Sequence, residues 1–275
     1  MTTHPPDAFL PASRIRFGVV TPTLNAERYL EETLRSVWSQ RSERVEIEHV
    51  LVDGGSTDRT VEIAGRYPTR VVVATDDHGM YDAINRGLAL VGGDVVGYLN
   101  ADDEIAPGGL AAVAEAFLRH PEAQWLIGKR EFIDGDGRAF GWMQPVPFSL
   151  REYIGLGWSC VPQETVWMRR PFMDRLLPFD TTFRNTGDYD LYVRARKLAA
   201  PLILDEVTGR FRLHGEQLSF DPEVMSRESR RVQEKNGRVD RLGWVAGRYL
   251  SLRLNMRNLA WLYAKKTGKI RYVAD

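Results

Sequence analysis

The sequence predicts an α/β protein in which a mostly parallel sheet is flanked by helices on both faces. Segments typical of strands and of helices alternate along the first hundred residues. The strand segments include continuous apolar runs, which suit strands buried on both faces of a sheet. Loops rich in Asp, Asn, Thr or Gly follow the strands, at the edge where ligands of such sheets bind. We expect strands at residues 15–21, 45–52, 70–74 and 95–99, and helices at residues 26–40, 58–67 and 80–91.

Apolar periodicity and capping residues predict the helices. Residues 26–40 place apolar side chains at helical spacing between Tyr29 and Trp38. Ser56 and Thr57 are suitable N-caps for the helix at residues 58–67. A helix at residues 107–120 opens with a proline in its first turn.

The second half predicts further strands and helices. The Asp-Gly-Asp-Gly run at residues 134–137 is a strong hairpin signal. The remaining elements expected are strands within residues 125–148, a short helix at 149–156, a loop and strand at 158–169, a helix at 188–199 and a strand at 201–213.

Composition narrows the class of protein. The chain has 275 residues, 43% hydrophobic and 27% charged, as in ordinary globular proteins. Its one cysteine, Cys160, excludes an internal disulfide and a zinc site built from several cysteines. The N-terminal segment lacks the apolar core of a signal peptide, and no stretch approaches the roughly 20 apolar residues of a membrane-spanning helix. We therefore expect a cytoplasmic location.

Charge is divided unevenly along the chain. Basic and acidic residues balance overall at 37 each, yet residues 225–275 hold thirteen basic and four acidic residues and so carry +9. Residues 1–224 carry −9, which suits a body that binds cations or cation-bridged ligands. We expect a flexible lead at residues 1–13, an α/β domain at residues 14–224 and a basic amphipathic helical extension at residues 225–275.

The sharpest polar motif follows the apolar strand at residues 95–99. It reads Asn100-Ala101-Asp102-Asp103. Carboxylates at the end of a strand can hold Mg²⁺ or Mn²⁺ whose other ligands are phosphate oxygens. Alternatively, one aspartate caps the helix that starts near Pro107.

A second polar loop follows the strand at residues 45–52. Its glycines, Gly54 and Gly55, allow a ligand to approach the backbone, and Asp53 could accept hydrogen bonds from a nucleobase. Ser56 capping the next helix is a structural alternative that is compatible with this role.

Two further motifs lie near the end of the predicted domain. Asp188 enters a helix, where the helix dipole keeps a carboxylate ionised and able to act as a base; a simple helix cap is the alternative. His214 follows the last strand and could bind a metal ion, and Arg212 could pair with a diphosphate. Either residue could instead be an ordinary surface group.

Three runs carry a resemblance to a known family: VVTPTLNAERYLEETLRSVWSQ, VDGGSTDRTVEIA and DDHGMYDAINRGLALVGGDVVGYLNADD. The sequence resembles glycosyltransferase family 2, which has the Rossmann-like GT-A fold, and in particular the bacterial enzymes that build lipopolysaccharide, capsule and exopolysaccharide. The resemblance covers residues 15–215, and several motifs in order make it more specific than any one of them. It implies a nucleotide-binding half at residues 14–104 and an acceptor-binding half at residues 105–224.

The resemblance also implies a set of nucleotide-binding residues, in which Asp53 reads the base. They are Thr21, Pro22, Asp53, Asp77, Gly79, Asp82, Asn85, Asn100 and Ala101. The metal motif of the family usually begins with Asp where this chain has Asn100, so Asp102 is the expected metal ligand and metal affinity is expected to be weaker. His214 is the expected second ligand or a diphosphate contact, beside Arg212.

The catalytic base of the family aligns with Asp188. Gly187 stands where the family often has Glu, so Asp190 stays a second candidate. On the acceptor side, Gln163 and Glu164 would hydrogen-bond sugar hydroxyls while Trp158 stacks on a sugar ring, unless Trp158 is a core aromatic.

These residues imply an inverting transfer from a nucleotide-diphosphate sugar, with UDP-sugars favoured, to a glycan or lipid-linked acceptor in cell-surface polysaccharide biosynthesis. The implied cofactor is Mn²⁺ or Mg²⁺. Two alternatives stay open. A nucleotidyltransferase would want a basic, glycine-rich triphosphate loop, which TPTLNAERY is not. A catalytically silent nucleotide-sugar-binding module would be consistent with Asn100.

The basic tail allows two interpretations. Residues 242–264 interleave aromatic and aliphatic residues with arginines, which suits an interfacial helix on an anionic membrane and a peripheral location on its inner face. The alternative is a helix packed against the body or against a second subunit of a homo-oligomer. Nucleic-acid binding is not expected, because the body is acidic and no nucleic-acid motif is present.

Overall fold

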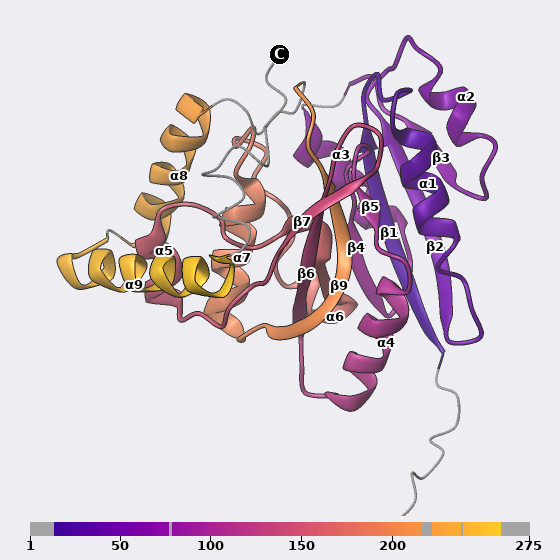
Figure 1. The fold of residues 1–275 in the computed structure, drawn as a ribbon. Helices are drawn as coiled ribbons and strands as arrows, with labels where there is room; N and C mark the ends of the chain where they lie inside the picture. Colours follow the sequence, from indigo (N-terminus) through magenta and orange to yellow (C-terminus); the bar gives the residue numbers. More distant parts are fainter. Residues whose placement is uncertain (1–13, 77–78, 216–221, 238, 260–275) are drawn as a thin grey trace, which may run out of the picture.

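The computed structural model describes residues 14–76, 79–215, 222–237 and 239–259. These residues form one nine-stranded sheet with the order β3-β2-β1-β4-β8-β6-β9-β5, and β7 pairs with β6. Figure 1 shows the sheet between α1 and α2 on one side of the view and α5, α7, α8 and α9 on the other. The predicted α/β fold with a mostly parallel sheet and flanking helices is therefore confirmed.

The first half alternates strands and helices as predicted. Its elements are β1 (Ile15–Thr23), α1 (Leu30–Trp38), β2 (Val45–Asp53), α2 (Thr60–Ala64), β3 (Arg70–Val73), α3 (Met80–Leu90) and β4 (Val95–Tyr98). β3, β2, β1 and β4 are parallel neighbours. Both α1 and α2 begin later than expected, because the residues before them bond the two loops together. The Ala26 N–H donates to Thr60 Oγ1 (2.8 Å), and the Glu27 N–H donates to Asp58 Oδ2 (3.0 Å).

The second half extends the sheet with antiparallel as well as parallel pairs. Its elements are β5 (Glu104–Ile105), α4 (Gly109–Arg119), β6 (Trp125–Ile133), β7 (Ala139–Met143), α5 (Leu150–Leu156), the 3₁₀ turn η1 (Gln163–Thr165), β8 (Val166–Arg169), α6 (Arg170–Asp174), α7 (Gly187–Leu198) and β9 (Leu202–Arg212). β8 joins the two halves, because it is antiparallel to both β4 and β6. The sequence did not predict β5, η1 or α6, which are each at most five residues long.

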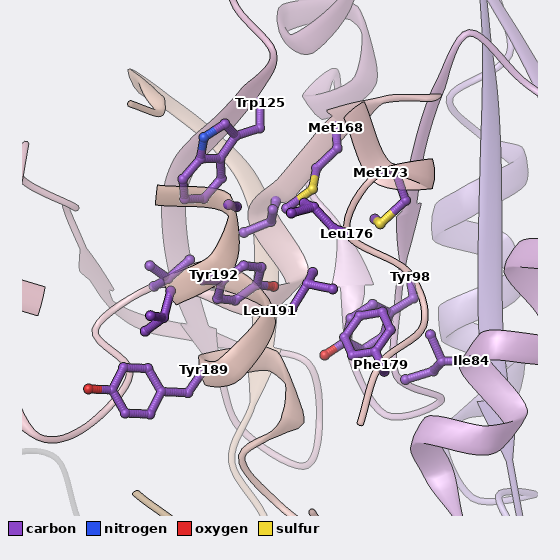
Figure 2. Packing of buried hydrophobic residues seen from close by; sticks show 14 of the residues in the cluster. Ile84, Tyr98, Trp125, Met168, Met173, Leu176, Phe179, Tyr189, Leu191 and Tyr192 are labelled. Carbon is purple, nitrogen blue, oxygen red and sulfur yellow. The ribbon is translucent and has the colours of Figure 1, made fainter. Parts of the chain in front are cut away.

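An aromatic core fills the space between the sheet and α7 (Figure 2). Trp125 stacks on Tyr192 with ring centroids 6.0 Å apart, and Tyr98 meets Phe179 edge-to-face at 5.7 Å. The Trp125 indole N–H donates to the Ala199 carbonyl (3.1 Å), so its polar atom is satisfied although the side chain is buried. This core fixes α7 against the sheet.

Two helices follow the sheet: α8 (Pro222–Asn236) and α9 (Arg241–Arg257). The buried side chain of Val232 places α8 against the core. α9 crosses α5 so closely that a Cβ on Gly247 would lie 2.1 Å from the Gly155 carbonyl carbon. The position expected for the start of the extension, residue 225, lies inside α8. Among the described residues, no helix is long and apolar enough to cross a bilayer.

A substitution at Gly247 tests the close crossing of α9 over α5. Gly247→Ala adds a Cβ against backbone that cannot move aside, so we expect the free energy of unfolding to fall by about 1–3 kcal/mol. Urea unfolding followed by circular dichroism measures the change. Gly65→Ala is the matched control, because its Cβ would meet no atom closer than 3.5 Å and its φ is −64°. Equal losses, or no loss, in the two variants would contradict the close crossing.

Candidate active site

The candidate site lies at one edge of the sheet, where three parallel strands end. β2, β1 and β4 are neighbours, so their carboxyl ends meet at the same edge. Asp53 ends β2, and Asn100 follows β4 by two residues. Polar loops that are distant in the sequence are thereby brought together, as such sheets do for ligand sites.

Asp53 organises the loop after β2. It is buried, and one of its oxygens, Oδ2, accepts hydrogen bonds from the N–H groups of Gly55 (3.0 Å) and Ser56 (2.8 Å). Its other oxygen accepts from the hydroxyls of Ser56 (2.5 Å) and Thr23 (3.1 Å). Gly55 adopts φ +93°, a conformation that favours glycine. The carboxylate thus shapes this loop, and its contact with a nucleobase stays a prediction.

Thr21 and Pro22 lie within β1, and both are buried. The Thr21 hydroxyl is hydrogen-bonded to His49 Nε2 (2.9 Å) in the neighbouring strand. Burial lowers the pKa of His49 to about 3, so this imidazole is neutral. The Thr21 side chain therefore bonds within the sheet rather than at its edge.

The N-terminus of α3 supplies three of the expected nucleotide-binding residues. Gly79 is the N-cap with φ +107°, and a Cβ there would meet no atom within 4 Å. Asp82 bonds to Arg86 (3.2 Å). Asn85 bonds to both the carbonyl (3.0 Å) and the N–H (2.8 Å) of Phe179, so it holds the segment that leads to α7. The fourth expected residue, Asp77, lies outside the described residues.

Asp102 and His214 meet in the structure although they are 112 residues apart in the sequence. His214 Nε2 lies 3.0 Å from Asp102 Oδ2. The Asp102 side chain is 30% exposed, whereas that of His214 is 11% exposed. The two residues expected to bind a metal ion are therefore side by side at the end of β4.

Asn100 lies two residues before Asp102 in the loop that follows β4. The Asn100 Oδ1 atom is buried and has no hydrogen-bond partner in the described part of the chain. An unpaired buried amide oxygen is a suitable donor for Mg²⁺ or Mn²⁺. Within the same residues no group of three His, Cys, Asp or Glu side chains could hold a metal ion.

Asp103 supports the loop from inside. It is buried, and its Oδ1 accepts the Arg212 N–H (3.0 Å). Burial, with the adjacent charge of Asp102, raises the pKa of Asp103 well above its usual range. Asp103 therefore holds the loop, and Asp102 is the more accessible carboxylate of the two.

Arg212 is buried rather than open to a ligand. Its guanidinium donates to the Asp102 carbonyl (2.9 Å), to Glu104 Oε1 (2.6 Å) and to the Asp134 carbonyl (3.2 Å). The geometry gives no support for the expected diphosphate contact, because these partners occupy the guanidinium. Arg212 fixes the position of Asp102 instead.

Asp188 lies in the first turn of α7, next to Tyr81 of α3. Its carboxylate accepts the Tyr189 N–H (2.7 Å) and the Tyr81 hydroxyl (3.4 Å). Burial raises the pKa of Asp188 to about 6, although both hydrogen bonds lower it. A group with this pKa is ionised at neutral pH and can accept a proton.

Gly187 has a structural reason to lack a side chain. A Cβ there would lie 2.8–2.9 Å from three atoms of the Tyr81 ring. Tyr81 thus fills the space that a side chain at position 187 would need, and its hydroxyl also accepts the Asp188 N–H (3.3 Å). No pattern in the sequence distinguishes Tyr81 from its neighbours, and only the contact with Gly187 identifies it.

The second candidate base, Asp190, is fully buried and paired with two cations. Its carboxylate lies 3.0 Å from Arg194 Nε and 3.1 Å from Lys235 Nζ. The two ion pairs occupy this carboxylate, and its burial keeps it from contact with a substrate hydroxyl. The structure therefore favours Asp188.

The three expected acceptor residues differ in their exposure to solvent. Trp158 is 45% exposed and is not a core aromatic. Gln163 is buried and donates to the Tyr98 carbonyl (2.7 Å), while Glu164 is buried in a bidentate pair with Arg130 (2.6 and 2.5 Å). Trp158 is therefore the accessible member of the set.

Arg130, which the sequence did not predict as a site residue, links the two parts of the site. Burial raises the pKa values of Asp103 and Asp188, and the positive charge of Arg130 opposes both shifts. The same guanidinium neutralises Glu164. The one sequence signal for Arg130 was a basic side chain within a predicted strand. Its partners lie in segments far away in the sequence, and apolar periodicity does not show that they meet.

Comparison with known sequences identifies the family. Residues 18–192 match the model described as "Glycosyl transferase family 2". An uncharacterized glycosyltransferase of Mycobacterium tuberculosis is 29% identical over 226 residues, which cover 80% of this chain and 84% of that protein. A "PGL/p-HBAD biosynthesis glycosyltransferase" of Mycobacterium bovis is 30% identical over 183 residues, which cover 65% of this chain and 68% of that protein.

Comparison with solved structures agrees on the fold. TarS of S. aureus in complex with UDP has a TM-score of 0.61 at 21% identity, and the match covers 80% of this chain and 65% of that chain. A mannosyltransferase from Pyrobaculum calidifontis, in complex with GDP-Man and Mn²⁺, has a TM-score of 0.61 at 19% identity and covers 94% of this chain and 76% of the other. With the GT-A arrangement of its sheet and the family match over most of its α/β region, the chain belongs to glycosyltransferase family 2.

Proposed function

We propose that the protein transfers a sugar from a nucleotide-diphosphate sugar to a hydroxyl of a glycan or lipid-linked acceptor, with inversion at the anomeric carbon. The contact between Asp102 and His214 at the end of β4 carries this proposal, because it unites two candidate ligands at the edge where nucleotides bind in such sheets. Cell-surface polysaccharide biosynthesis in the cytoplasm is the proposed setting. Family membership favours glycosyl transfer over nucleotidyl transfer.

Asp188 is the proposed base. Its carboxylate removes the proton of the acceptor hydroxyl while the hydroxyl oxygen attacks the anomeric carbon and the bond to the diphosphate breaks. A pKa of about 6 keeps the carboxylate ionised at neutral pH yet basic enough to take the proton. The hydrogen bond from Tyr81 orients the carboxylate. A single displacement of this kind inverts the anomeric configuration.

Asp102, His214 and the Asn100 amide oxygen are the proposed ligands of a divalent cation, Mn²⁺ or Mg²⁺. The cation would neutralise charge on the departing diphosphate. The unpaired Asn100 Oδ1 supports this assignment, since an amide oxygen is a weaker but suitable donor where many relatives use a carboxylate.

A UDP-sugar is the proposed donor. TarS has been solved with UDP and with UDP-GlcNAc, and the Pyrobaculum mannosyltransferase with GDP-Man and Mn²⁺, so the fold accommodates both kinds of donor. The loop of Asp53 is the proposed binding site of the nucleobase. The N-terminus of α3 at Gly79 is the proposed site beside the diphosphate. Trp158 is the proposed acceptor contact.

Asp188→Asn tests the base. We expect turnover to fall by about 10²–10⁴-fold, because the amide cannot accept the proton, while donor affinity stays nearly unchanged. Release of UDP from a UDP-sugar in the presence of acceptor measures turnover, and calorimetry measures donor binding. Asp190→Asn, the same change two residues along α7, is the control: it should lower stability through loss of the pairs with Arg194 and Lys235 but leave turnover of the folded enzyme. The opposite pattern would assign the base to Asp190.

The pH profile tests the role of Tyr81. Activity should fall below pH about 6 as Asp188 becomes protonated, because only the carboxylate accepts the proton. Tyr81→Phe removes a hydrogen bond that lowers the pKa of Asp188, so the acidic limb should move to higher pH. Measured kcat/KM across pH gives both limbs. An unshifted limb would mean that Tyr81 does not act through Asp188.

Thermal stabilisation tests the donor and the cation together. A panel of UDP, GDP, dTDP, ADP and CDP, each with and without Mn²⁺, should give a Mn²⁺-dependent rise in Tm with UDP, because ligand binding stabilises the native state. Asp102→Ala should abolish the dependence on Mn²⁺. Asp136→Ala, an exposed carboxylate on the hairpin between β6 and β7, is the control and should leave it intact. No rise with any nucleotide would contradict the proposed nucleotide-sugar donor.

A further inference from the structure

α9 carries an apolar surface that its packing on α5 leaves open. Its outer stripe consists of residues at alternating spacings of three and four, and each is at least 53% exposed: Leu242, Val245, Tyr249, Leu252 and Met256. Trp244, beside this stripe, is also exposed. Figure 1 places α9 at the margin of the molecule, on the side opposite α1 and α2.

The outer stripe is not needed to hold α9 in place. A different set of residues faces the body: Gly243, Gly247, Leu250 and Leu254 are buried. The two glycines allow the close crossing over α5, and the two leucines join the aromatic core. A group of exposed aromatic and aliphatic side chains of this size marks an interaction surface, whereas single exposed apolar residues are common on any protein.

The charges on α9 are all of one sign. The helix contains four arginines and no acidic residue. Arg253 pairs with Glu152 (2.6 Å) and Arg257 with Asp205 (3.1 Å). Arg241 and Arg248 are exposed and have no ion pair within the described part of the chain. Arg248 lies over the Trp244 ring at 5.6 Å, so it borders the apolar surface directly.

This charge pattern indicates which kind of partner covers the outer stripe of α9. A spacing of three and four is also typical of a coiled-coil seam, which a second copy of the chain could complete. In such a dimer the flanking positions would bring Arg241, Arg248 and Arg253 against arginines, with no acidic residue on the helix to pair with them. The surface instead suits a partner with anionic groups at its surface and an apolar interior directly below them.

We propose that α9 docks on the surface of an anionic lipid bilayer, with the outer stripe in the apolar boundary and Arg241 and Arg248 among the headgroups. Trp244 and Tyr249 have the amphipathic rings that favour this interface. The helix lies along the membrane and does not cross it. This inference is independent of the proposed reaction, because membrane binding is measured without donor or acceptor.

Vesicle co-sedimentation of the full chain tests the proposal. The protein should bind vesicles of phosphatidylcholine mixed with phosphatidylglycerol, and bind vesicles of phosphatidylcholine alone much more weakly. Leu252→Glu with Met256→Glu should abolish binding. Arg241→Gln and Arg248→Gln should each lower the partition coefficient on the mixed vesicles by about fivefold. Added salt should weaken binding of the wild type, because the arginine contribution is screened.

Matched controls show whether loss of binding is specific to α9 or follows from any comparable change of charge or hydrophobicity on the protein. Leu198→Glu changes an exposed leucine at the end of α7, and Arg119→Gln changes an exposed arginine on α4. Both should bind as the wild type does. The α9 variants should keep the wild-type Tm, since the changed side chains are exposed. Equal binding to both kinds of vesicle, or none, would overturn the proposal. So would a dimer in sedimentation velocity that Leu252→Glu dissociates, because the second copy would then be the occupant.

Discussion

The buried guanidinium of Arg212 joins segments that are far apart in the sequence. It bonds to the loop after β4 at the Asp102 carbonyl, to Glu104 of β5 and to the turn of the β6–β7 hairpin at Asp134. The backbone N–H of Arg212 donates to the buried carboxylate of Asp103. A buried arginine is tolerated only when such partners compensate its lost hydration. The same bonds set where β9 ends, and so where His214 meets Asp102.

Electrostatics at this edge follow from how far each carboxylate is buried. Asp103 and Glu164 are buried, and Arg212 and Arg130 respectively supply their hydrogen bonds. Asp102 and Asp188 are only partly buried, and in the described part of the chain no Arg or Lys side chain is bonded to either carboxylate, whereas His214 contacts Asp102. The more deeply placed carboxylates thus support the loops, and the two more accessible ones are left for ligand chemistry. This division explains why Asp188 and Asp102 stand out among the acidic residues.

The sequence predicted the strands and helices of the first half and the edge that holds the site, because apolar strand segments alternate with helical periodicity and polar loops follow the strands. It could not predict β5 or η1, which are too short for periodicity. Nor could it separate Asp188 from Asp190: both lie in the first turn of α7, and only the contacts with Arg194, Lys235 and Tyr81 distinguish them. Arg212 and Glu164 had suitable chemistry but proved to be buried, which their loop and strand patterns do not reveal.

Glu228 couples the C-terminal helices to the site. The buried carboxylate of Glu228, in α8, accepts the N–H groups of Arg184, Asn185 and Thr186. These residues directly precede Gly187 and Asp188, so α8 sets where α7 begins. α9 begins five residues after α8 ends and is anchored on α5, which also packs against α7. A bilayer bound to the outer stripe of α9 would therefore be held in a fixed relation to Asp188, and an acceptor carried on a lipid would approach the base from a defined direction.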